Sequence, residues 1–129
     1  MPIEFERAVP IFRIYSVEKA LEFYVDFLGF SVDAEHRFAP GGPVFMRVSR
    51  GTLALHLSEH FGDGTPGSIV YVYMTGVRGL HRELNDKKYR HCRPGLMEQE
   101  WGMTEMSVAD PFNNRITFGE RTATAADGA

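Results

Sequence analysis

The sequence predicts an α+β domain built from two β-α-β-β-β modules. Three observations predict it: a capped amphipathic helix with a strand on either side opens the chain, the same order of elements recurs after residue 68, and a turn-rich stretch at 61–67 separates the two. We expect a single domain over residues 1–121, with one module at about 5–60 and the other at about 68–120. Residues 122–129 have no periodicity and are predicted to be a flexible tail.

The first helix is the best-defined element. Ser16 can cap its first turn, and Gly29 can end it, because glycine adopts a left-handed conformation at little cost. A strand at 9–14 precedes it. Its apolar residues fall at helical spacing: Val17, Ala20, Leu21, Tyr24, Phe27 and Leu28.

The rest of the first module reads as three strands. They are expected at 31–38, 44–49 and 52–58, with a Pro- and Gly-containing turn after the first and an Arg50-Gly51 hairpin before the last. Alternation places Leu53, Leu55 and Leu57 under the helix, so His56 faces the other side.

The second module follows the same plan. A strand at 68–74 precedes a weaker helical stripe that ends near 87–88, and strands follow at 103–109 and 115–120. Alternation divides the first of these strands into Ser68, Val70, Val72 and Met74 on one face and Ile69, Tyr71 and Tyr73 on the other, and it does not decide which set faces inward.

Composition excludes several classes of protein. The chain has 129 residues and a net charge of −3, so it carries no basic field for nucleic acid. No apolar run approaches membrane-spanning length, and the N-terminus lacks the apolar core of a signal peptide. Cys92 is the single cysteine, so no intrachain disulfide can form. We therefore expect a cytoplasmic protein with neither a nucleic-acid nor a membrane partner.

Two motifs resemble the vicinal oxygen chelate superfamily, which includes glyoxalase I, extradiol dioxygenases, fosfomycin-resistance enzymes and bleomycin-resistance proteins. They are Phe23-Tyr24-x-x-Phe27-Leu28-Gly29-Phe30 and Asp110-Pro111-Phe112-Asn113-Asn114-Arg115. The resemblance spans about residues 9–120. It implies curved mixed sheets around a pocket, helices outside, and a homodimer. The family usually has glycine where Asn113 stands, and often where Lys88 stands.

The resemblance also implies where a catalytic metal would bind. The four ligand positions correspond to Val9, His56, Ser68 and Thr117, and only His56 is a good ligand for a divalent metal. Catalytic sites of this kind need about three imidazole or carboxylate ligands. We therefore expect neither a metal nor another cofactor, and we assign no catalytic residue.

Aromatic residues point to a ligand. Trp101 precedes the strand at 103–109, where the resemblance to bleomycin-resistance proteins implies an aromatic that stacks on the ligand. The alternative for Trp101 is a place in the core or at a subunit interface. Phe38 and Phe61 flank turns at the mouth of the first half. The predicted ligand-binding residues are Phe38, His56, Phe61, Ser68, Trp101 and Thr117.

The predicted function is metal-independent binding of a small molecule, a drug or an aromatic metabolite, with protection by sequestration. One alternative is a metal-dependent glyoxalase-like lyase or extradiol-dioxygenase-like enzyme, with His36, His60 or Glu105 grouped around His56. Another is a member of the fold that binds an unknown metabolite.

Overall fold

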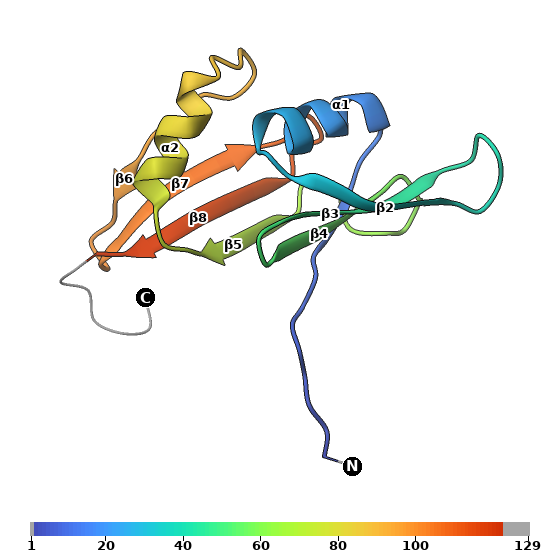
Figure 1. The fold of residues 1–129 in the computed structure, drawn as a ribbon, viewed down its shortest axis with the longest axis horizontal. Helices are drawn as coiled ribbons and strands as arrows, with labels where there is room; N and C mark the ends of the chain where they lie inside the picture. Colours follow the sequence, from blue (N-terminus) through green and yellow to red (C-terminus); the bar gives the residue numbers. More distant parts are fainter. Residues whose placement is uncertain (1, 123–129) are drawn as a thin grey trace.

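The computed structural model describes residues 2–122, which form two modules with the same order of elements (Figure 1). The first contains β1 (Ile11–Arg13), α1 (Val17–Leu21), the π-helical segment η1 (Glu22–Phe27), β2 (Ser31–Arg37), β3 (Val44–Arg50) and β4 (Leu53–Ser58). The second contains β5 (Ile69–Tyr73), α2 (Val77–Asp86), β6 (Met97–Glu98), β7 (Met103–Ala109) and β8 (Arg115–Arg121). The predicted α+β fold with two β-α-β-β-β modules is confirmed. Of the predicted tail, only Thr122 lies within the described residues.

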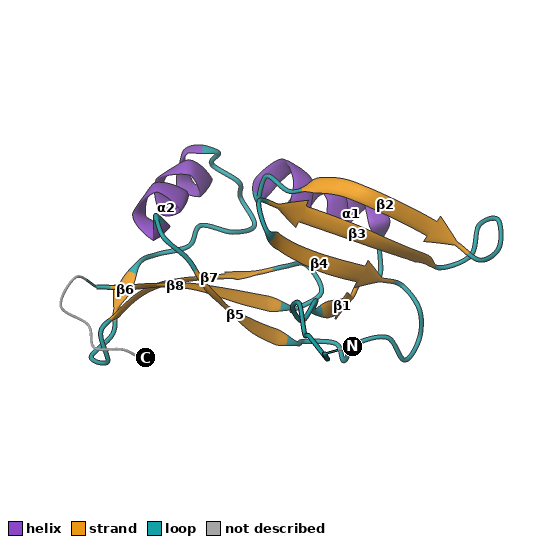
Figure 2. Cartoon of the chain, turned by 60° about the horizontal axis from the view of Figure 1, so that its bottom comes forward, coloured by secondary structure: helices purple, strands orange, loops and turns teal. Residues whose placement is uncertain are grey.

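Each module has its own four-stranded mixed sheet. The strand orders are β1-β4-β3-β2 and β5-β8-β7-β6, so the first strand of each module pairs in parallel with the last. The other pairs are antiparallel. One feature differs from the expected architecture: within one chain the sheets lie beside each other and stay open, so they do not curl around a common pocket (Figure 2).

The helix of the first module is not α-helical throughout. Ser16 caps it as predicted, since its Oγ accepts a hydrogen bond from the Lys19 backbone N–H at 3.2 Å, and Gly29 ends it with φ of +78°. Between them the α-helix changes to the π-helical segment η1. Phe23 and Tyr24 in that segment are both buried. An apolar stripe read at 3.6 residues per turn does not distinguish the two helix types.

The core lies between the helices and one face of each sheet. Leu55 and Leu57 of β4 point into it, as predicted, together with Ile116 and Phe118 of β8. Both helices lie on the same side of the molecule (Figure 1), so the other face of each sheet is open. Within residues 2–122, no helix is long and apolar enough to cross a membrane.

The two sequence motifs meet at the junction of the modules. Tyr24 of η1 donates a hydrogen bond from its hydroxyl to Asp110 Oδ2 at 2.7 Å. Asp110 Oδ1 accepts from the backbone N–H groups of Phe112 and Asn114, at 2.9 and 2.8 Å. The Asn114 side chain donates to the carbonyl oxygen of Arg13 at 2.9 Å. The motifs that carry the family resemblance therefore form a buried polar link between the modules.

Candidate functional site

The open face of the second sheet carries an aromatic row. Ile69, Tyr71 and Tyr73 of β5 are 63%, 40% and 54% exposed, whereas Val70 and Val72 are partly buried against the core. The sequence did not decide which of the two sets of β5 residues faces the core, and the structure places the set with the two tyrosines on the open face. We call this surface face B and define it by Ile69, Tyr71, Tyr73, Glu105, Ser107, Arg115, Thr117 and Gly119.

Tyr71 lies across β8 to reach β7. A Cβ on Gly119 would overlap the hydroxyl oxygen of Tyr71, so the ring occupies space that only glycine leaves open. The hydroxyl donates to Glu105 Oε2 at 2.7 Å, and Glu105 Oε1 accepts from Gln99 Nε2 at 3.1 Å. Burial, and then the hydrogen bond to the carboxylate, raise the pKa of Tyr71 well above its ordinary value. Tyr71 is therefore a neutral, fixed ring at physiological pH.

Other side chains complete face B. The Tyr71 and Tyr73 ring centroids are 5.0 Å apart, and the guanidinium carbon of Arg121 lies 4.8 Å from the Tyr73 centroid. Thr117 shares a hydrogen bond of 2.8 Å with Ser107. The face combines aromatic surface with hydroxyl groups, a combination typical of sites that bind small organic molecules.

The open face of the first sheet is more basic. We call it face A and define it by Ile11, Arg13, Phe45, Arg47 and His56. The His56 ring lies 5.0 Å from that of Phe45. Burial, and then the charge of Arg47, lower the pKa of His56 below its ordinary value, so the imidazole is neutral at pH 7 and can donate and accept one hydrogen bond each.

The three predicted aromatic residues are all exposed. Phe38 is 77% exposed and packs edge-on against His36 and His60, with centroids 4.4 and 5.4 Å away. Phe61 is almost fully exposed and lies 6.0 Å from the Arg13 guanidinium carbon. Trp101 is exposed in the turn between β6 and β7. Phe38 and Phe61 thus belong to the first module, and Trp101 to the second.

The predicted polar residues divide in the same way. His56 lies on face A and Thr117 on face B, as alternation predicts. Ser68 precedes β5 with the parity of Val70, and its hydroxyl donates to the Thr65 carbonyl oxygen at 2.6 Å. The structure therefore places Ser68 off face B, with Ile69 as the adjacent residue that lies on it.

Sequence reasoning missed Tyr71 and Tyr73 as members of the site. The signal was present, because the strand alternates aromatic with β-branched residues. Both sets are apolar, so hydrophobicity alone could not assign their faces. The contact between the Tyr71 ring and Gly119 joins residues that are 48 positions apart in the sequence, and no local sequence pattern predicts it.

The described residues do not fit a catalytic metal. Among residues 2–122, no three His, Cys, Asp or Glu side chains are grouped so that they could hold a metal ion. Within one chain the cluster proposed as an alternative is also divided, because His56 is on β4 of the first sheet and Glu105 on β7 of the second.

Comparison with known proteins gives a consistent family and fold. A family profile described as "Glyoxalase superfamily protein" matches residues 1–125. A bleomycin-binding protein from bleomycin-producing Streptomyces verticillus, complexed with copper(II)-bleomycin, is 27% identical with a TM-score of 0.68, over 98% of this chain and 100% of that one. A bleomycin-binding protein complexed with bleomycin is 19% identical with a TM-score of 0.70, over 91% and 99% of the two chains.

A third solved structure has the same fold. It is a member of the glyoxalase/bleomycin resistance protein/dioxygenase superfamily from Sphaerobacter thermophilus, 19% identical with a TM-score of 0.68, over 91% of this chain and 98% of that one. The search of curated protein sequences gives no match.

Proposed function

The chain belongs to the glyoxalase superfamily, and from that premise we propose that it binds a planar aromatic small molecule and protects by sequestration, without a metal and without turnover. The observation that carries the proposal is the aromatic row of face B. Tyr71 and Tyr73 are large, partly exposed and held in place by neighbours, which lowers the entropic cost of stacking a ligand on them. The structural relatives that bind bleomycin support the same class of function.

The proposal includes a homodimer. In one chain, faces A and B lie beside each other and do not oppose each other (Figure 2), so each needs a second wall to form an enclosed pocket. Exposed apolar side chains such as Ile69 and Tyr73 on one face are typical of a surface that is covered by another molecule. Face B of one copy opposite face A of another would bring Tyr71 and His56 into one pocket.

The charges of the pocket constrain the ligand. Face A contributes Arg13 and Arg47, and Arg47 lies 3.4 Å from an Asp33 carboxylate oxygen. Face B contributes Arg115 and also Glu105, whose two oxygens already accept hydrogen bonds. A strongly cationic ligand would therefore meet like charges on both walls. We propose a neutral or weakly charged aromatic drug or metabolite.

The metal-free part of the proposal rests on the residues present. The family ligand positions carry Val9, His56, Ser68 and Thr117, and the described residues of one chain offer no group of three metal ligands. A cytoplasmic location stays a prediction from the sequence.

The test is a ligand titration in metal-free and metal-supplemented buffer. Bleomycin, its copper(II) complex and a panel of planar aromatic metabolites are added, while Trp101 fluorescence and thermal unfolding are recorded. A ligand at a hundredfold excess over its Kd should stabilise the protein by about 2.7 kcal/mol. Tyr71→Phe should keep this effect, because it keeps the ring, and Tyr71→Ala should weaken it. The ligand should be recovered unchanged.

Three results would contradict the proposal. One is a stoichiometric zinc, nickel, iron or manganese ion in protein purified without a metal-affinity tag. Another is conversion of the ligand to a product. The third is equal binding by wild type and Tyr71→Ala.

A further inference from the structure

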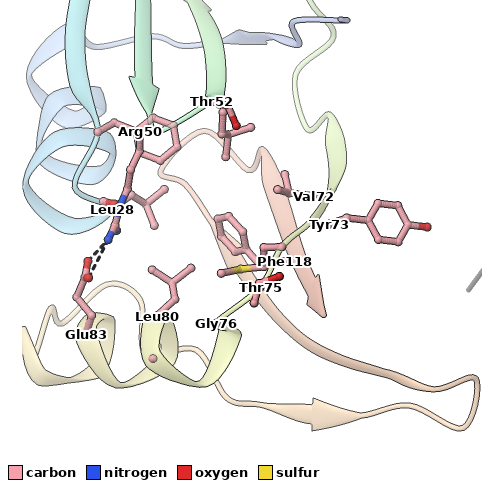
Figure 3. Close-up of a pocket in the computed structure, with 14 residues that line it drawn as sticks. Leu28, Arg50, Thr52, Val72, Tyr73, Thr75, Gly76, Leu80, Glu83 and Phe118 are labelled. Carbon is pink, nitrogen blue, oxygen red and sulfur yellow. Dashed lines mark hydrogen bonds and ion pairs between the residues drawn. The ribbon is translucent and has the colours of Figure 1, made fainter. Parts of the chain in front are cut away.

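A cleft separate from both open faces lies at the junction of the two modules (Figure 3). Its volume is about 440 Å³. The end of the first helical segment and the β3–β4 hairpin form one wall, and the end of β5 with the start of α2 forms the other. Tyr73 belongs to the lining, but its ring points away from the cleft in Figure 3, so face B and the cleft present different surfaces.

The floor of the cleft is apolar and comes from both modules. Leu28 and Phe30 of the first module and Phe118 of the second are buried at its base. Leu53 and Leu80 line it from opposite sides and are partly buried. The modules thus bring apolar surfaces together without closing the space between them. Such a concave apolar surface is typical of a site for a small organic molecule.

The charged groups at the cleft neutralise each other. Arg50 forms a two-pronged ion pair with Glu83 of α2, with N–O distances of 2.8 and 2.9 Å, and its Nη1 also donates to the Leu28 carbonyl oxygen at 2.9 Å. The hydrogen bond from Arg50 lowers the pKa of Glu83, so the pair stays ionised at neutral pH. No charge of this pair is left for a ligand, which favours a neutral molecule.

Gly79 gives an independent indication that the space is kept open. It lies inside α2, where glycine weakens the helix relative to alanine. A Cβ at this position would meet no atom within 4 Å, and the backbone is not in the left-handed region, so neither packing nor conformation requires glycine. Gly79 also lines the cleft, so the absence of a side chain at this position leaves that part of the cleft wall open. The open space of the cleft gives a reason for glycine at position 79, where the helix alone would favour another residue.

We propose that this cleft binds a neutral, largely apolar small molecule, at a site distinct from the aromatic face B. Its volume lies in the range of pockets that hold drug-sized ligands. Thr52 and Thr75, which also line it, add hydroxyl groups that can orient one polar end of such a molecule.

Nile red, a neutral apolar dye whose fluorescence rises in apolar surroundings, serves as the probe. Wild type should bind it, and the methyl resonance of Met74, which lines the cleft, should shift in a carbon–proton spectrum while that of Met97 on β6 stays unchanged. Gly79→Leu should fill the cleft and weaken dye binding, as followed by the Met74 shift, at least tenfold. Leucine favours a helix interior more than glycine, so the variant should fold, as circular dichroism and thermal unfolding will show.

Two variants are controls. Arg82→Leu adds the same side chain to α2 outside the cleft, and Tyr71→Ala removes a ring from face B. Arg82→Leu should bind Nile red as wild type does. Tyr71→Ala should keep the dye-induced shift of the Met74 methyl resonance, and this result would hold whether or not the function proposed for face B is correct, because Met74 reports on the cleft.

Several outcomes would overturn the inference. They are absence of a dye-induced Met74 shift in wild type, an equal shift at equal dye concentration in Gly79→Leu, and loss of the shift in Tyr71→Ala with Gly79→Leu unaffected. A wild-type dimer that Gly79→Leu converts to monomers, with no dye bound by either, would show that a second copy covers the cleft.

Discussion

Asp110 should be a major source of stability, because it satisfies buried donors from both modules. Tyr24 and Asn114 are each 1% exposed and Asp110 is 7% exposed. In Asp110→Ala, the Tyr24 hydroxyl and both the backbone N–H and the side-chain amide of Asn114 lose the carboxylate that accepts their hydrogen bonds. A buried donor without a partner costs about 1–3 kcal/mol. For three such donors we expect the free energy of unfolding to fall by about 6 kcal/mol.

Removing the Tyr24 hydroxyl provides the decisive comparison. In wild type, Tyr24→Phe deletes one hydrogen bond to a charged acceptor and should cost about 1.5 kcal/mol. In Asp110→Ala, the same change removes a buried hydroxyl without a partner, so it should stabilise by about 1 kcal/mol. The difference is a coupling energy of about 2.5 kcal/mol.

The assay is urea unfolding of wild type, the two single variants and the double variant, followed by circular dichroism. The slopes of free energy against urea must agree before the free energies are compared. Additive effects of the two substitutions would refute the reasoning, because they would mean that the hydroxyl and the carboxylate stabilise the fold independently.

Three further predictions concern single positions. The pKa of His56 is lower in the folded protein than in the unfolded chain, so the unfolded chain binds a proton at this residue first as pH falls below about 6.5. Wild type should therefore lose stability between pH 7.5 and 5.5. Thermal unfolding of His56→Gln should lack this part of the loss. Gly119→Ala should displace the Tyr71 ring from Glu105 and return the tyrosine pKa toward about 10, and an unchanged ultraviolet titration of tyrosinate would contradict this. Lys88→Gly should stabilise by about 0.5 kcal/mol, measured by urea unfolding, because Lys88 has a φ of +52°.

The elements that the sequence predicted well have strong local signals. The Ser16 cap, the Gly29 stop and the alternation around His56 are each read within a few residues, and the structure has all three. The left-handed conformations at Asn113 and Lys88, with φ of +70° and +52°, agree with positions where the family usually or often has glycine.

The candidate site was harder to predict, because its contacts join distant parts of the chain. Face B depends on Tyr71 lying on Gly119 and reaching Glu105, contacts that span 48 and 34 residues. The periodicity of apolar residues also cannot predict the π-helical segment η1, because its apolar residues fit an α-helix equally well.

The two modules share a topology, yet their open faces have different chemistry. The difference arises because the shared topology constrains only the residues that face the core. The order of elements is maintained by core-facing residues, such as Leu55 in the first sheet and Phe118 in the second, which must be apolar. The alternate residues face away from the core, so packing does not constrain them.

That freedom lets one open face become basic around His56 and the other aromatic around Tyr71. Within one chain these faces lie beside each other (Figure 2), so they do not enclose a molecule between them. If two copies place unlike faces opposite each other, a ligand meets an aromatic wall and a basic wall together. A dimer that paired like faces would give two different pockets, and His56→Gln would then leave binding at face B unchanged.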